Sequence, residues 1–127
     1  MSTLRRALLV STATLALAGA AAVPAGATPT GSFLKLDKEI VRAGEQVRVV
    51  AGCGVDGLNF VGSTAFAPTG QDGPYTGNGG VAVFDVRTTA VSWGSATVRA
   101  DAMPGIYQVS ERCGGGHAGS KELTVIS

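Results

Sequence analysis

Few side chains in this 127-residue sequence could carry chemistry. His117 is the only histidine, and it lies in the glycine-rich stretch Gly114–Gly119. A serine or cysteine hydrolase would need this imidazole to pair with a nucleophile and a carboxylate. No Gly-x-Ser-x-Gly motif is present, and the acidic residues are scattered along the chain. We therefore expect an exposed loop histidine without a catalytic role, and a protein that is not an enzyme.

The two cysteines, Cys53 and Cys113, could form a disulfide, remain free thiols or ligate a metal ion. A structural zinc site takes four nitrogen or sulfur ligands, and two cysteines with one histidine are too few. The N-terminal segment described below predicts an exported protein, in which a disulfide is the expected pairing. Closing a loop of about 60 residues would stabilise the fold by about 4 kcal/mol in the chain-entropy model.

Two glycine-containing stretches have compositions that could suggest cofactor sites. Gln71-Asp72-Gly73 offers one carboxylate, whereas a calcium loop needs several spaced oxygen ligands, so Asp72 is interpreted as a turn residue. Gly77-Asn78-Gly79-Gly80 lacks the Lys-Ser/Thr pair of a phosphate-binding loop. We expect no cofactor and no metal ion, and we expect Pro68–Gly80 to be an irregular, flexible loop.

The first 27 residues have the three-part order of a secretory signal peptide. Arg5 and Arg6 give a positive start, residues 7–23 are uncharged and apolar, and Ala25-Gly26-Ala27 matches the small-x-small cleavage pattern. An uncleaved membrane anchor is the alternative, but the apolar run is short for a bilayer span. The sequence predicts cleavage after Ala27, no membrane span in the mature chain, and one secreted extracellular domain over residues 28–127.

The distribution of charge argues against two classes of partner. Of the ten Lys and Arg residues only Arg5 and Arg6 precede residue 28, so the predicted mature chain has eight basic against nine acidic residues. Nucleic acids and anionic membrane surfaces both require concentrated positive charge, which this scattered pattern does not supply. We expect a monomer whose partner is an extracellular protein or a component of the cell envelope.

The region after residue 27 is typical of an all-β protein. It is rich in β-branched Val, shows no helical periodicity, and is punctuated by glycine and proline at short intervals. In Gln46–Cys53, Val47 and Val49 alternate with Gln46 and Arg48, which is the period of a half-buried strand. Seven strands are predicted: 32–36 continued at 40–41, 46–53, 61–67, 81–88, 93–100, 106–113 and 121–126.

The positions of the cysteines and of Tyr107 resemble those of a seven-stranded immunoglobulin-like β-sandwich. Cys53 ends the second predicted strand, Cys113 ends the sixth, and Tyr107 lies near the start of the sixth. The resemblance implies one disulfide between the sheets and a tyrosine corner, in which Tyr107 hydrogen-bonds to the backbone. Antibody domains differ, because their tyrosine lies two residues before the second cysteine and their tryptophan lies on the third strand; here Trp93 lies on the fifth.

A closer likeness is to the small exported immunoglobulin-like proteins of actinobacteria such as streptomycetes. Their shared pattern is a strand entered through A/P-G-[DE]-x-V-x-V and a later P-G-x-Y-x-V, each leading to a cysteine. Here these segments are A-G-E-Q-V-R-V from Ala43 and P-G-I-Y-Q-V from Pro104. The likeness spans nearly the whole predicted mature chain, but its motifs are structural and imply no chemistry.

Glu111 conflicts with the inward pattern of the sixth predicted strand. It has the same parity as Tyr107, Val109 and Cys113, which should all face the core. Either a bulge shifts the register at this point, or Glu111 lies at the open end of the sandwich.

In the implied topology the second and sixth strands run in the same direction, so the loops after them emerge at one end. This brings segments 54–60 and 114–119 together, with 89–92 beside them, and puts Tyr75 at the opposite end. Aromatic and apolar side chains on such loops are common anchors of recognition surfaces, although they could also cap the core. Six residues are candidates for this ligand end: Asp56, Leu58, Asn59, Phe60, Trp93 and His117.

Two functions stay open from the sequence. The favoured hypothesis is a secreted, non-catalytic module that binds a partner at the cell surface or in the extracellular matrix. The alternative is a small secreted effector, either a hydrolase inhibitor that uses the loop Pro68–Gly80 or a carrier of a small molecule.

Overall fold

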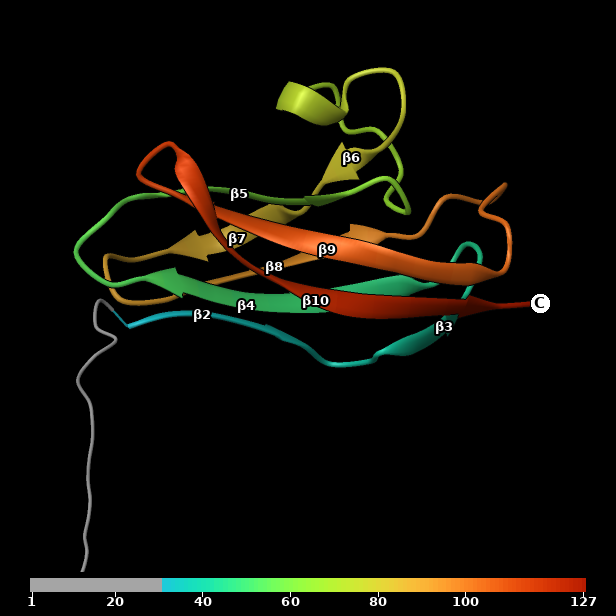
Figure 1. Cartoon of the computed structure of the whole chain (residues 1–127), viewed down its shortest axis with the longest axis horizontal. Coiled ribbons are helices and arrows are strands. Elements are labelled where there is room, and N and C mark those ends of the chain that lie inside the picture. Colours follow the sequence, from blue (N-terminus) through green and yellow to red (C-terminus); the bar gives the residue numbers. More distant parts are fainter. Residues whose placement is uncertain (1–30) are drawn as a thin grey trace, which may run out of the picture. The chain divides into compact units, whose positions relative to one another are not determined.

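The computed structural model describes residues 31–127, so the predicted signal peptide and its cleavage site lie outside the described residues. Two β-sheets pack face to face in this part of the chain (Figure 1). The four-stranded sheet has the order β2 (Ser32–Leu36), β4 (Gln46–Cys53), β8 (Ser92–Thr97) and β7 (Val83–Arg87). The five-stranded sheet has the order β3 (Ile40–Arg42), β10 (Gly116–Ile126), β9 (Gly105–Cys113), β5 (Leu58–Ser63) and β6 (Gly80–Val81). The prediction of an all-β, two-sheet protein is confirmed.

The alternation of apolar and polar residues determines which face each strand buries. In β4 the side chains of Val47 and Val49 are buried, whereas Gln46 and Arg48 between them are exposed. The same period of two holds in β8, where Ser92 and Ala96 are buried and Trp93 points to the outer face. Each sheet therefore has one apolar face, and the two apolar faces meet.

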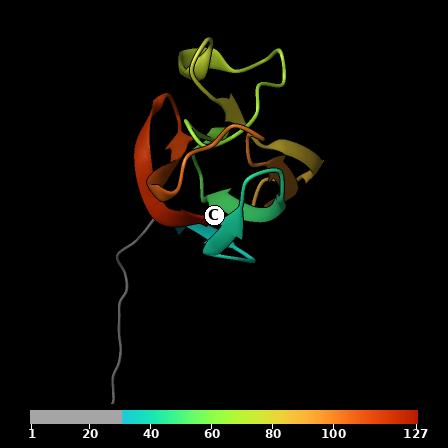
Figure 2. The same cartoon turned by 90° about the vertical axis from the view of Figure 1, so that its right-hand side faces the viewer.

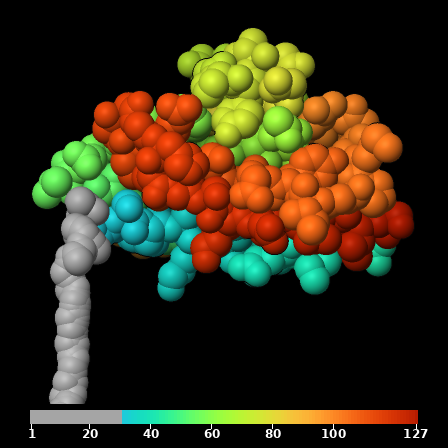
Figure 3. Space-filling view, in the orientation of Figure 1, coloured from blue at the N-terminus to red at the C-terminus, as the bar shows by residue number. Residues whose placement is uncertain are grey.

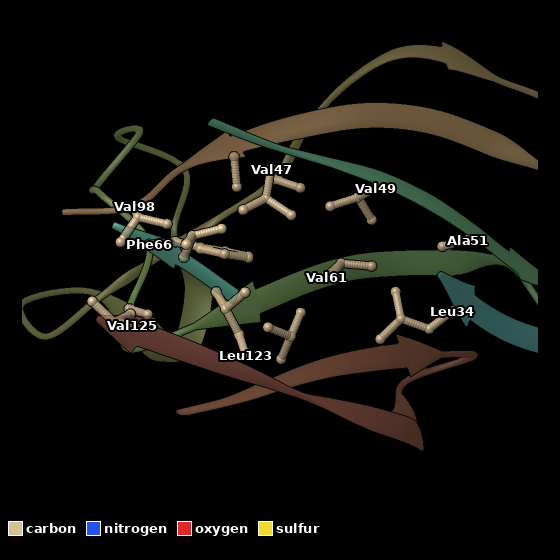
Figure 4. Close-up of a cluster of buried hydrophobic side chains, with 14 residues drawn as sticks. Leu34, Val47, Val49, Ala51, Val61, Phe66, Val98, Leu123 and Val125 are labelled. Atoms are coloured by element: carbon tan, nitrogen blue, oxygen red, sulfur yellow. The ribbon is translucent and has the colours of Figure 1, made fainter. Parts of the chain in front are cut away.

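The core lies between the two sheets and is drawn in Figure 4. Leu34 reaches it from one sheet and Val61 and Leu123 from the other, while Phe66 enters from the segment after β5. Phe66 and Leu123 are fully buried. Full burial of a side chain of this size stabilises the fold by about 1.5–3 kcal/mol.

Nine strands are present in residues 31–127, two more than the sequence predicted. The first predicted strand divides, because β2 pairs with β4 in one sheet and β3 pairs in parallel with β10 in the other. The predicted strand at 81–88 also divides at Ala82, since β6 pairs with β5 and β7 pairs with β8. Hydrophobic period indicates that a segment is extended but not which sheet it joins.

The disulfide and Tyr107 connect parts of the sandwich that are distant in sequence. Cys53 at the end of β4 and Cys113 at the end of β9 form a disulfide, with their Cα atoms 5.6 Å apart. The bridge therefore joins the two sheets, and this prediction is confirmed. The hydroxyl of Tyr107 donates a hydrogen bond of 2.6 Å to the carbonyl oxygen of Met103, which is the contact that the resemblance implied.

The connection between β5 and β6, residues 64–79, is called the β5–β6 loop. It stands out from the two sheets in the end-on view of Figure 2 and forms the protrusion at the top of Figure 3. The sequence predicted a strand at 61–67 and irregular structure at 68–80, but β5 spans Leu58–Ser63, and the loop contains a short 3-10 helix, η5 (Gly73–Tyr75). Among residues 31–127 no helix is long and apolar enough to cross a membrane.

Candidate functional site

The connections β4–β5 and β9–β10 lie at the same end of the sandwich, on the left of Figure 1. The amide of Gly114 donates a hydrogen bond of 2.8 Å to the carbonyl of Gly57, and the amide of Gly115 donates one of 2.5 Å to Oδ1 of Asn59. We call this region, residues 53–59 with 113–117, the disulfide end. These hydrogen bonds hold its two connections together, as the predicted topology requires.

The β9–β10 connection is tighter than the sequence indicated. Gly114 and Gly115 have φ values of 59° and 86°, and two successive positive φ angles are what a two-residue type I′ hairpin turn requires. Strand β10 consequently begins at Gly116 instead of residue 121. His117 is therefore a strand residue that pairs with Arg112, not a loop residue.

The polar candidate residues of the disulfide end differ in what their side chains do. The side-chain oxygen of Asn59 accepts a hydrogen bond from the amide of Gly115. The side chains of Asp56 and His117 are exposed, and no hydrogen bond to either side chain is present within residues 31–127. Asp56 and His117 are thus the two charged or titratable candidates that a partner could reach at this end.

The three apolar candidates, Leu58, Phe60 and Trp93, do not form one surface with Asp56 and His117. Leu58 packs against the core, so its interpretation as a core-capping residue is supported. Phe60 is half-buried on the outer face of the five-stranded sheet, because its neighbour Val61 faces inward. Trp93 is 40% exposed on the outer face of the other sheet. The sandwich therefore separates Phe60 from Trp93.

Tyr75 of the β5–β6 loop lies against Phe60, which corrects the expectation that these residues belong to opposite ends. The two rings meet edge to face, with their centroids 6.0 Å apart and their planes at 89°. Tyr75 also covers Gly62, where an added Cβ would lie 2.3 Å from the ring. The Arg112 guanidinium carbon is also near this ring, 5.9 Å from the Phe60 ring centroid. The loop is thus folded back onto the sheet.

Asp72 holds the same loop in place. Its carboxylate accepts hydrogen bonds from the amides of Thr69, Gly70 and Val81 and from the hydroxyl of Thr69, at 2.8–3.3 Å. Burial acts to raise the pKa of Asp72, but these hydrogen bonds outweigh it and lower the pKa below its usual value. Asp72 is a turn residue, as predicted, and it links the loop to β6 and so limits the loop's freedom.

An open cavity of about 540 Å³ is lined by residues of β6 and β7, which are edge strands of the two sheets. Its walls include the rings of Phe60 and Phe84 and the side chain of Val81, and Thr69 and Gln71 contribute from the β5–β6 loop. The Arg87 guanidinium carbon is 4.9 Å from the Phe84 ring centroid, and Nη1 donates to the carbonyl of Leu58. Sequence reasoning missed this cavity because its walls come from four separate segments.

Glu111 faces inward, beside the disulfide. Its side chain is 1% exposed, and a carboxylate oxygen lies 3.9 Å from Sγ of Cys53. Burial raises the pKa of Glu111 to about 7, against a smaller lowering effect of a hydrogen bond from the Gly52 backbone. The pairing register shifts beside Glu111, as the first alternative expected, but β9 keeps its own alternation and Glu111 stays inward and buried.

Bulges are nevertheless present, in the two strands that flank β9. One lies in β10 between His117 and Gly119, and the other in β5 between Leu58 and Phe60. They alter the pairing beside Glu111 and Arg112 without turning Glu111 outward. The sequence showed that Glu111 is an acidic residue at an inward position. It did not show why the residue is there.

Comparison with models of known protein families and with curated proteins found no match to this chain.

Proposed function

We propose that this chain is a secreted, non-catalytic module of the immunoglobulin-like class that binds a partner at the cell surface or in the extracellular matrix. Two features support the class: the disulfide between β4 and β9, and the hydrogen bond from Tyr107 to the backbone of Met103. The proposed signal peptide supports secretion. The proposed binding region is the disulfide end.

The observation that carries the binding proposal is the pair of hydrogen bonds from Gly114 and Gly115 to the β4–β5 connection. Loops that are already held in one arrangement lose less conformational entropy on binding than mobile loops do. Asp56 and His117 are exposed on this ordered end and offer an acceptor and a titratable ring.

The test is a binding measurement on immobilised envelope and matrix fractions from the producing cells. The double variant D56A/H117A should lose binding by about tenfold or more, the size expected for removal of contacts at the centre of an interface. The matched control, K38A/E39A, removes one basic and one acidic exposed side chain from the β2–β3 connection and should bind as the unaltered protein does. Equal binding by both variants, or no binding by the unaltered protein, would contradict the proposal.

The cavity favours a second candidate, a carrier of a small molecule. Its volume of about 540 Å³ lies within the usual range of ligand pockets, about 300–1,000 Å³. Phe60 and Phe84 offer apolar and aromatic contact, and Arg87 offers a positive charge. A compact aromatic carboxylate fits this combination.

Titration with naphthoate, followed by ligand-observed NMR, tests the carrier. Naphthoate should bind, and R87Q should weaken binding by about tenfold through loss of one charge-assisted contact. R48Q, which removes an exposed arginine from β4, is the matched control and should leave binding unchanged. No binding of naphthoate at millimolar concentration would remove this candidate and leave the first one intact.

A further inference from the structure

Glu111 and Asp72 are the buried carboxylates of residues 31–127, but only Asp72 is surrounded by donors. Asp72 accepts from three amides and a hydroxyl. Glu111 has one backbone hydrogen bond, from Gly52, and no salt bridge within the described part of the chain. A buried carboxylate with one backbone donor and no charged partner is costly to ionise, so Glu111 keeps its proton up to a pH of about 7.

The nearest reactive group to Glu111 is the disulfide. The sulfur atoms of Cys53 and Cys113 and a carboxylate oxygen of Glu111 all lie within 4.8 Å of one another. The two cysteines differ in exposure, because Cys53 is 2% exposed whereas Cys113 is half-buried. Cys113 is followed by Gly114–Gly116, which have no side chains to cover it.

We propose that the Cys53–Cys113 bridge is a site of thiol–disulfide exchange, in which Glu111 donates a proton to the leaving sulfur of Cys53. An external thiolate attacks Sγ of Cys113, the bond between the two cysteine sulfurs breaks, and the electron pair goes to Sγ of Cys53. The Glu111 carboxyl transfers its proton to this sulfur and becomes a carboxylate. The products are a mixed disulfide at Cys113 and a thiol at Cys53.

With a dithiol as the external reductant, the reaction goes to completion. The second thiolate of the dithiol attacks its own sulfur in the mixed disulfide, and Cys113 leaves as a thiolate that takes a proton from water. The dithiol is oxidised to a cyclic disulfide, and the protein bridge is reduced by the same two electrons. The proton from Glu111 matters in the first step, because a thiolate buried at Cys53 would lie in apolar surroundings that disfavour its charge.

Other titratable groups around Glu111 are few. On β9 the adjacent Arg112 faces outward, toward Phe60. On β10 the exposed residues His117 and Lys121 are paired with Arg112 and Val109. On β4 and β9 the cysteines do not titrate while they are bridged, and β5 and β8 contribute no titratable side chain. The experiment must therefore distinguish the effect of Glu111 on the pH dependence from any effect of His117.

The experiment measures reduction of the folded, secreted protein by dithiothreitol between pH 5.5 and 8.5, with the rate constant expressed per thiolate. For the unaltered protein this constant should fall as pH rises through about 7, where Glu111 loses its proton. The variant E111Q should give a pH-independent constant, lower by about tenfold or more at pH 6, a modest effect for general acid catalysis. Above pH 8 the two proteins should converge.

Two variants serve as controls. D72N alters the other buried carboxylate, and H117Q removes the imidazole on the neighbouring strand β10; both should keep the pH profile of the unaltered protein. E111D, which keeps a carboxyl group on a shorter side chain, should restore part of the rate at pH 6. If E111Q does not fold, the profile of the unaltered protein and that of H117Q still decide the matter.

Three outcomes would overturn the proposal. The first is a constant per thiolate that does not change with pH in the unaltered protein. The second is a profile that disappears in H117Q but persists in E111Q. The third is a rate that becomes independent of dithiothreitol concentration and equals the rate of global unfolding, since reduction would then occur only in the unfolded chain.

Discussion

Asp72 in the β5–β6 loop and Glu111 in the core are carboxyl groups with almost the same exposure, 6% and 1%, but with opposite shifts in pKa. Asp72 is surrounded by amide donors and is held as an anion. Glu111 lies between the two sheets with a single backbone donor, and its pKa of about 7 leaves it about half protonated at neutral pH. The comparison teaches that the supply of hydrogen-bond donors, and not burial alone, decides the charge of an inward carboxyl group.

The largest effect on stability is expected from removal of the disulfide beside Glu111. The variant C53A/C113A should lose about 4 kcal/mol of unfolding free energy, the value expected for opening a loop closed across 60 residues. Urea denaturation of the variant and of the oxidised protein measures this. Hydrogen exchange at the amides bound by Asp72 should remain protected in the folded variant, because those contacts do not involve the bridge. A loss below about 1 kcal/mol would show that the bridge does little for the fold.

The second test uses the pH dependence of stability. The pKa of Glu111 is raised from 4.5 to about 7 in the folded state, so the folded protein binds more protons than the unfolded chain between these values. Its contribution is therefore fully present below pH 4.5 and is lost as pH rises toward 7, by at most about 3 kcal/mol. Urea unfolding at a series of pH values should show this slope in the unaltered protein and not in E111Q. Parallel curves for the two proteins would contradict the account.

The third test concerns Asp72, whose effect on the pH dependence of stability is opposite to that of Glu111. The pKa of Asp72 is lowered, so its stabilising contribution is present above its usual pKa of 3.8 and is lost as pH falls below that value. D72N removes the charge of this side chain, so it should loosen the β5–β6 loop at neutral pH as protonation of Asp72 does at low pH. Hydrogen exchange at Gly70 and Val81 should become about tenfold faster, the effect of about one lost buried hydrogen bond. Unchanged exchange would show that the loop is held by Tyr75 alone.

The smallest effect is expected from G62A. The added Cβ would meet the Tyr75 ring at 2.3 Å, and moving this ring aside should cost about 1 kcal/mol, the low end for overpacking. Gly57, where an added Cβ meets nothing within 4 Å, provides the matched control G57A. Urea unfolding should separate the two variants, and tyrosine fluorescence should change only in G62A. Equal behaviour would mean that the contact between Tyr75 and the sheet is unimportant.

The fold was predictable where apolar and polar residues alternate along one segment, and where the number of cysteines left one possible pair. Alternation identified β4, and the two cysteines together with the predicted export identified the bridge. The division at Ala82 was not predictable, because a continuous extended segment gives no local sign that its two halves belong to different sheets.

The candidate site was predictable only in part. The meeting of the β4–β5 and β9–β10 connections follows from strand direction, and Asp56 and His117 are exposed there as expected. The contact of Tyr75 with Phe60 depends on how a 16-residue loop folds back, and the cavity depends on the same loop. Glu111 was recognised as an inward acid, but its distance from Cys53 depends on how closely the two sheets pack.

The parallel pairing of β3 with β10 has a mechanical consequence. Residues 40–42 lie beside 124–126, and the Arg42 guanidinium donates a hydrogen bond to the main-chain oxygen of Ser127. Tension between the start of β3 and residue 127 pulls these two parallel strands in opposite directions along their length. Their hydrogen bonds then carry the load together in shear instead of opening one at a time. The described domain is arranged to resist stretching along the chain.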